Sequence, residues 1–232
     1  MMKKDNITIS GIPAVIWGPD ADKGYIFVHG KMGSKEDAGH FAEIAVAKGY
    51  QVVSFDLPEH GERRDEDYPV MAWNGVKDLR LISDFAVGRW QEINLYACSL
   101  GVYFSLLAYQ DINLKKSLFQ CPLLNMERLI QNMMGWFQIS EEELQARQEI
   151  ATPIGEVLYW DYYMYAKEHP VDQWHSETYI LYPSEDNLTE RTTVDEFIQR
   201  NQGNLTVLEG AEHFFTDQEH QARLESWLQN MV

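Results

Sequence analysis

Short apolar runs alternate along the chain with longer segments whose apolar residues recur at helical spacing. The runs predict strands, and the spacing of Val76, Leu79, Ile82 and Ala86 is typical of an amphipathic helix. The expected strands are Ile7–Ile9, Ala14–Trp17, Tyr25–His29, Gln51–Asp56, the run around Ile93, Lys116–Gln120, Thr178–Tyr182 and Leu205–Leu208. The expected helices are Glu36–Lys48, Ala72–Arg89, Leu100–Tyr109, Thr192–Arg200 and Gln218–Met231. This alternation predicts one α/β domain, residues 1–232, with a mostly parallel central sheet flanked by helices.

Local signals mark some of the boundaries between these elements. Ser34 is expected to cap the helix that begins at Glu36, and Gly49 lies just past the end of that helix. Gly11–Pro13 is expected to form the turn between the first two strands.

One segment breaks the alternation of strands and helices. Leu123–His175 lies between two predicted strands and is far longer than a crossover requires. The segment is rich in aromatic residues and methionine, and Ser140 with Glu143 resembles a capping box. Its expected helices are Met126–Phe137, Glu141–Ile150 and Glu156–Glu168. Because insertions of this kind often cover a site, we expect residues 123–175 to form a helical cap or lid.

The charge of the chain excludes some classes of partner. The 232 residues include 19 Lys and Arg against 36 Asp and Glu, a formal net charge of −17. Nucleic acids and anionic membranes are recognised by clustered cations, so neither is an expected partner. Cys98 and Cys121 lie in apolar runs and are expected to pack in the core. No apolar run is long enough for a membrane span and Met1–Ser10 lacks an apolar signal core, so a cytoplasmic location is expected.

The strongest chemical signal follows the strand around Ile93. That strand ends in Ala97-Cys98-Ser99-Leu100-Gly101, and an apolar helix is expected immediately afterwards. A serine between a strand and a helix, with small residues two positions before and after it, is the pattern of a nucleophile elbow. Ser99 is therefore a candidate nucleophile at the carboxyl end of a strand.

A serine nucleophile needs a base and an acid that orients the base. His213 follows the last predicted strand, and Asp186 follows the strand before it. Because ligand sites of open α/β sheets lie outside the carboxyl ends of the strands, we expect both side chains near Ser99. The alternative acids are Glu185, Asp161 and Asp172.

An oxyanion hole requires backbone N–H groups beside the nucleophile. The strand that ends at His29 is followed by Gly30-Lys31-Met32-Gly33, whose two glycines allow the backbone to turn its amides toward the serine. The amide of Leu100, directly after the nucleophile, is expected to supply a second donor. His29 and His60 are expected to brace this loop through hydrogen bonds.

In their order along the chain, these motifs resemble those of the α/β-hydrolase superfamily. His29-Gly30 is similar to its HG motif, and the segment from Asp56 to Arg63 is similar to its D-x-x-G-H-G-x-S loop. The elbow, the acid loop and the base loop follow in the family's order, so the resemblance covers almost the whole chain. It looks closest to small bacterial esterase-like members with a helical cap. The resemblance implies an α/β-hydrolase fold, Ser99 as nucleophile, His213 as general base, Asp186 as orienting acid, and the amides of Lys31 and Leu100 as oxyanion hole.

The chain departs from the family pattern at a few positions. Ala97 stands in place of the first elbow glycine, Glu59 in place of a glycine, and Glu62-Arg63 in place of the usual x-Ser. We expect the changes at Glu59, Glu62 and Arg63 to lie beside the mouth of the site and to alter substrate choice.

The expected activity is hydrolysis of a small to medium, uncharged carboxylic ester, with a small-molecule acyl substrate as partner. A peptidase, a thioesterase or an acyltransferase with the same triad is an open alternative, and so is a non-catalytic binding module with the hydrolase fold. No metal-ligand motif and no phosphate loop is present, so we expect no metal and no cofactor. The oligomeric state is left open, a homodimer included.

Overall fold

The computed structural model describes every residue of the chain except Met1 and Asp172. Its centre is an eight-stranded sheet in the order β1-β2-β4-β3-β5-β6-β9-β10. The strands are β1 Lys4–Ile9, β2 Ile12–Trp17, β3 Lys23–Val28, β4 Gln51–Phe55, β5 Glu92–Cys98, β6 Leu114–Gln120, β9 Glu177–Glu185 and β10 Asn204–Glu212. β2 pairs antiparallel with both β1 and β4, and the remaining pairs are parallel. The prediction of a mostly parallel sheet is confirmed.

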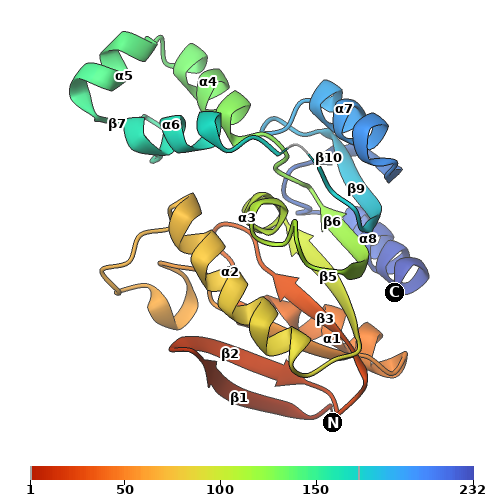
Figure 1. The fold of residues 1–232 in the computed structure, drawn as a ribbon. Helices are drawn as coiled ribbons and strands as arrows, with labels where there is room; N and C mark the ends of the chain where they lie inside the picture. Colours follow the sequence, from red (N-terminus) through yellow and green to blue (C-terminus); the bar gives the residue numbers. More distant parts are fainter. Residues whose placement is uncertain (1, 172) are drawn as a thin grey trace.

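Helices cover both faces of this sheet (Figure 1). One face packs against α2 Ala72–Val87, α3 Leu100–Ala108 and α7 Arg191–Asn201, and the other against α1 Ala38–Ala47 and α8 Gln218–Met231. Two 3₁₀ turns, η1 Lys35–Asp37 and η2 Gly61–Arg63, lie in the loops that follow β3 and β4. Across the described part of the chain, no helix combines the length and the apolar character that a membrane crossing needs.

Short-range interactions explain where several elements begin. The Ser34 side chain accepts a hydrogen bond from the amide of Glu36 at 3.3 Å, and the Asp37 carboxylate accepts one from the amide of Ser34 at 3.0 Å. The predicted cap is therefore present, although it opens a 3₁₀ turn ahead of α1. The first hairpin turns at Ser10 and Gly11, with φ of 50° and 91°, so Ile12 and Pro13 of the predicted turn belong to β2 instead. Positive φ at both central residues is the geometry that a two-residue hairpin requires.

The described residues between β6 and β9 form three helices and a two-stranded hairpin, which lie above α2 and α3 in the view of Figure 1. These elements are α4 Met126–Trp136, α5 Glu141–Arg147, β7 Glu149–Ala151, β8 Val157–Tyr159 and α6 Trp160–Glu168. Two predicted helices are therefore too long. The helix predicted to end at Ile150 stops at Arg147, because Gln148 has a φ of 65°, and the helix predicted from Glu156 begins only at Trp160.

Candidate active site

Ser99 lies between β5 and α3 in a strained backbone conformation. Its φ of 47° and ψ of −116° fall in a region that residues other than glycine rarely adopt. The small residue two positions later has a steric reason, because a Cβ atom on Gly101 would lie 2.5 Å from the carbonyl oxygen of His29. The predicted sharp turn between strand and helix is therefore present, with the serine at the carboxyl end of β5.

His213 lies just beyond β10, and its Nε2 atom is 2.8 Å from the Oγ atom of Ser99. The strand is irregular directly before this residue. Between Leu208 and Glu212, β10 advances four positions while its neighbour β9 advances two. Gly210, with a φ of 74°, lies within this bulge, and its amide donates a hydrogen bond to the Ser184 side chain.

Asp186 follows β9 and contacts the other side of the same imidazole ring. Its Oδ2 atom is 2.8 Å from Nδ1 of His213, and both side chains are almost fully buried. Its Oδ1 atom accepts hydrogen bonds from the amides of Leu188 at 2.8 Å and Thr189 at 3.0 Å. Ser99, His213 and Asp186 come from separate loops and lie in one chain of hydrogen bonds.

None of the described alternative acids has a hydrogen bond to His213. Asp161 accepts a hydrogen bond from the amide of Tyr162 at the start of α6. Glu185 is exposed at the end of β9. Asp172 lies outside the described residues.

The loop after β3 forms a tight turn against Ser99. The amide of Gly33 donates a hydrogen bond to the carbonyl oxygen of Gly30 at 3.2 Å, so Lys31 and Met32 occupy the centre of the turn. Met32 has a φ of 66°, a left-handed conformation that usually favours glycine. A Cβ atom on Gly30 would lie 3.2 Å from Cβ of Ser99, so the turn packs directly against the serine. Among the described residues, the amide of Lys31 donates no hydrogen bond.

Two buried histidines hold this turn in place. Nε2 of His60 accepts a hydrogen bond from the amide of Met32 at 3.0 Å, and Nε2 of His29 accepts one from the amide of Leu57 at 3.1 Å. Each ring therefore carries a proton on Nδ1, which lies 2.7 Å from a backbone carbonyl oxygen in both cases. Burial lowers the pKa of His29 to about 4, which keeps that ring neutral near pH 7.

Buried charges support the loop after β4. The Asp56 carboxylate accepts hydrogen bonds from Nζ of Lys35 at 2.7 Å and from the amide of Glu62 at 3.0 Å. Arg63 forms an ion pair with Asp78 at 2.6 Å and is only 5% exposed. The prediction that Arg63 lies beside the mouth of the site is wrong, because this guanidinium is buried inside the protein and stabilises the loop.

Cys98 precedes Ser99 in the sequence but is not suited to nucleophilic chemistry. Burial raises the pKa of its thiol to about 12, and its Sγ atom lies 3.4 Å from Oε1 of Gln120. The reactive form of cysteine is the thiolate, so this side chain stays inert at neutral pH.

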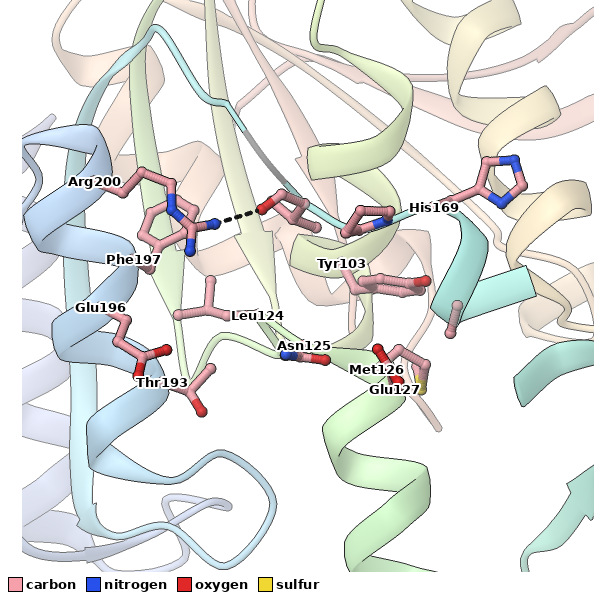
Figure 2. Close-up of a pocket in the computed structure, with 13 residues that line it drawn as sticks. Tyr103, Leu124, Asn125, Met126, Glu127, His169, Thr193, Glu196, Phe197 and Arg200 are labelled. Atoms are coloured by element: carbon pink, nitrogen blue, oxygen red, sulfur yellow. Dashed lines mark hydrogen bonds between the residues drawn. The ribbon is translucent and has the colours of Figure 1, made fainter. Parts of the chain in front are cut away.

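A cavity of about 210 Å³ lies at the base of the insertion (Figure 2). Its walls are formed by the start of α4, by the residues around the end of α6, by α7, and by Tyr103 of α3. Ser99, His213 and Asp186 do not line it. At its edge, Arg200 donates a hydrogen bond to the carbonyl oxygen of Val171 at 3.1 Å. Sequence reasoning missed this cavity because its residues share no motif and meet only in the folded chain.

No family model matches the chain, and neither does any curated protein. Solved structures match it over almost its whole length. Est1E from Butyrivibrio proteoclasticus, with ferulic acid bound, is 16% identical with a TM-score of 0.77, and the match covers 97% of this chain and 96% of Est1E. Alpha/beta hydrolase domain-containing protein 10 from mouse is 13% identical with a TM-score of 0.76, and the match covers 99% of this chain and 97% of the mouse protein. The esterase Pf2001 from Pyrococcus furiosus is 17% identical with a TM-score of 0.67, and the match covers 100% of this chain and 90% of Pf2001.

At these identities the likeness concerns the fold. The chain has the α/β-hydrolase fold, as the order of its sequence motifs predicted. Because this fold supports many activities, the activity of a given chain depends on the side chains at the carboxyl ends of its strands.

Proposed function

We propose that this protein is a serine hydrolase that cleaves a carboxylic ester. The observation that carries the proposal is the chain of hydrogen bonds from Ser99 through His213 to Asp186, with 2.8 Å at both links. A serine activated by a histidine, which is itself oriented by a carboxylate, is the arrangement of acyl-transfer catalysts on several unrelated folds. The strained backbone of Ser99 supports the same reading, because such strain concentrates at functional sites.

The proposed reaction has two halves. Nε2 of His213 takes the proton of Ser99 as Oγ attacks the ester carbonyl carbon, and the same proton then goes to the departing alcohol. Water next attacks the acyl-serine, His213 takes a proton from that water, and the acid is released as the proton returns to Oγ. Asp186 keeps the proton of the neutral ring on Nδ1 and stabilises the imidazolium in both halves.

The amides of Lys31 and Leu100 are proposed to bind the oxyanion. Two observations support Lys31: its turn packs against Ser99, and its N–H donates no hydrogen bond among the described residues. The hydrogen bond from the Met32 amide to His60 fixes the neighbouring peptide. Donors of this kind each lower the barrier by about 3 kcal/mol.

Residues 123–175 are proposed to act as a cap over the site and to set the substrate. The ion pair between Lys31 and Glu156 supports this role, because it joins the insertion to the turn beside Ser99. Aromatic side chains of the insertion favour an uncharged, partly apolar ester. The ferulic acid bound to Est1E makes esters of aromatic acids a rational part of the first screen. The net charge of −17 disfavours acyl-CoA thioesters, which are strongly anionic.

Labelling with a fluorophosphonate, followed by intact mass and peptide mapping, tests the proposal. We expect one adduct on Ser99, its loss in Ser99→Ala, and a strong reduction in His213→Ala. The matched control is Ser105→Ala, because Ser105 lies in α3, the helix directly after Ser99, and its hydroxyl group donates its hydrogen bond to the carbonyl oxygen of Gly101. For the best ester found, Ser99→Ala should lower kcat by at least about 10⁴-fold, and the control should stay near the parent.

Unchanged ester hydrolysis in Ser99→Ala would refute the serine mechanism. Failure of both a large and a small phosphonate to label the parent would instead favour the non-catalytic binding module. Parallel assays of an ester, an amide and a thioester with the same acyl group separate esterase, peptidase and thioesterase. Faster turnover with added alcohol or amine would indicate an acyltransferase.

A further inference from the structure

An ion pair joins two segments that are 125 residues apart in the sequence. Nζ of Lys31, in the turn against Ser99, contacts the carboxylate of Glu156, in the loop between β7 and β8 of the insertion. The two side chains are 46% and 35% exposed, so the pair lies at the surface. It is located where the insertion meets the sheet domain, by which we mean the eight-stranded sheet with α1, α2, α3, α7 and α8. Any movement of the hairpin away from the sheet therefore has to break or stretch this contact.

Both partners are mounted on tightly held loops. The carbonyl oxygen of Glu156 accepts hydrogen bonds from the amide of Thr152 at 2.7 Å and from its hydroxyl group at 2.8 Å. Gly155, with a φ of 85°, closes this loop by donating its amide to Thr152. On the other side, the Gly33 to Gly30 hydrogen bond closes the turn around Lys31. The ion pair therefore joins two loops whose backbones are each closed by hydrogen bonds.

The packing of α6 against the sheet domain contains a polar defect. The hydroxyl groups of Tyr103 on α3 and Tyr162 on α6 are buried and have no hydrogen-bond partner among the described residues. Tyr162 packs here against Trp73 of α2, with ring centroids 6.1 Å apart. A buried hydroxyl without a partner destabilises the state that buries it, and movement of α6 would hydrate both groups. These two hydroxyl groups therefore lower the stability of the packing between α6 and the rest of the protein.

We propose that Glu156 is a positioning residue for the reaction: through the Lys31 side chain it holds the backbone amide of Lys31 where the oxyanion forms. This inference rests on the proposed serine-hydrolase function. Closure of the insertion would then complete the oxyanion hole, because Glu156 reaches Lys31 only when the hairpin lies against the sheet domain. A half-exposed ion pair of this kind supports an effect of about threefold to fivefold on the rate.

The experiment measures kcat and KM for Glu156→Gln, Lys31→Met and the double variant. The matched control is Glu149→Gln, which removes the same charge from an exposed position of the same hairpin. We expect kcat to fall about threefold to fivefold in each single variant, with KM nearly unchanged and no further loss in the double variant. The control should retain the parental kcat. A charge exchange, Lys31→Glu with Glu156→Lys, should recover most of the loss, and a simple loss of stability would not produce that recovery.

High salt gives an independent readout. About 0.5 M NaCl should lower the parental kcat toward the value of Glu156→Gln and leave that variant unaffected, because salt screens an exposed pair. Equal kcat values for Glu156→Gln and Glu149→Gln, or no recovery in the charge exchange, would overturn the positioning role. If fluorophosphonate labels Ser99 in the parent, such a kinetic outcome refutes the role of the Lys31–Glu156 pair and leaves the proposed function standing. If neither a large nor a small phosphonate labels the parent, the proposed function fails and the role of Glu156 fails with it.

Discussion

His29 makes the stability of the folded protein depend on pH. Its pKa is about 4 in the folded protein and about 6.5 in an unfolded chain. As the pH falls below 6.5, the unfolded chain takes up this proton first, so the folded state loses stability progressively down to pH 4. The loss attributable to His29 reaches about 3 kcal/mol. Urea unfolding at a series of pH values between 4 and 7 measures it.

A pair of variants isolates the His29 contribution from that of the many carboxylates. His29→Gln should flatten the dependence of the unfolding free energy on pH over this range. His40→Gln, at an exposed position, should leave the dependence as it is in the parent. Identical pH dependence in all three proteins would show that His29 titrates normally.

Both cysteines are expected to be unreactive in the folded protein. Burial raises the pKa of Cys98 to about 12 and raises that of Cys121 well above its usual value. At pH 8, iodoacetamide should therefore modify the folded protein about a thousandfold more slowly than the urea-unfolded chain. Mass spectrometry over time measures both rates, and rapid loss of one thiol in the folded state would contradict the expectation.

The residues brought together at the site were predictable because each carries a local motif. Ser99, Asp186 and His213 each follow a predicted strand, and parallel strands place such loops at one edge of a sheet. The ion pair between Arg63 and Asp78 was not predictable in the same way, because nothing in the sequence links those two positions. Their contact depends on where η2 lies against α2.

At the scale of elements, the contact between α3 and β3 depends on a missing side chain. A Cβ atom on Gly101 would lie 2.5 Å from the carbonyl oxygen of His29 and 2.7 Å from that of Val28. Gly101→Ala should therefore destabilise the protein by about 1–3 kcal/mol. Gly135→Ala in α4 is the matched control, because no atom lies within 4 Å of its added Cβ, and it should stabilise by about 0.5–1 kcal/mol. Urea unfolding compares them, and equal effects would refute the steric argument.

The insertion shows why element boundaries are harder to predict than the elements themselves. Its helical spacing predicted three helices, and its described residues form three. The hairpin between α5 and α6 was missed because Ile150 and Val157 also fit a helical pattern. The overlooked signal is Pro153 with Gly155, since both residues favour a turn and Gly155 adopts a φ of 85°.

At the scale of the whole molecule, the net charge of −17 opposes compaction. Raising NaCl from about 10 to about 150 mM should raise Tm by screening this repulsion. Differential scanning calorimetry at constant pH measures the shift, with equal osmolality of sucrose as the control for effects unrelated to charge. A Tm that falls with salt would mean that surface ion pairs such as Arg128–Glu190 contribute more than the overall repulsion.

The alternation of strands and helices was sufficient to predict a mostly parallel sheet flanked by helices, but not the order of its strands or the face that each helix covers. The cavity at the base of the insertion was not predictable, because Tyr103 and the residues of α4, α6 and α7 that line it are brought together only by tertiary packing. Sequence periodicity identifies which face of an element is buried. It does not specify how well the buried faces fit.

The strained backbone of Ser99 has a consequence for how this chain can change over generations. A residue with φ of 47° and ψ of −116° is less stable there than glycine by about 1–3 kcal/mol. Ser99→Gly should therefore abolish ester hydrolysis and raise the unfolding temperature, which activity assays and calorimetry together would measure. A lineage that kept the protein only as a binding module would gain folding stability from that substitution. The serine therefore lowers stability without benefit unless its chemistry is under selection.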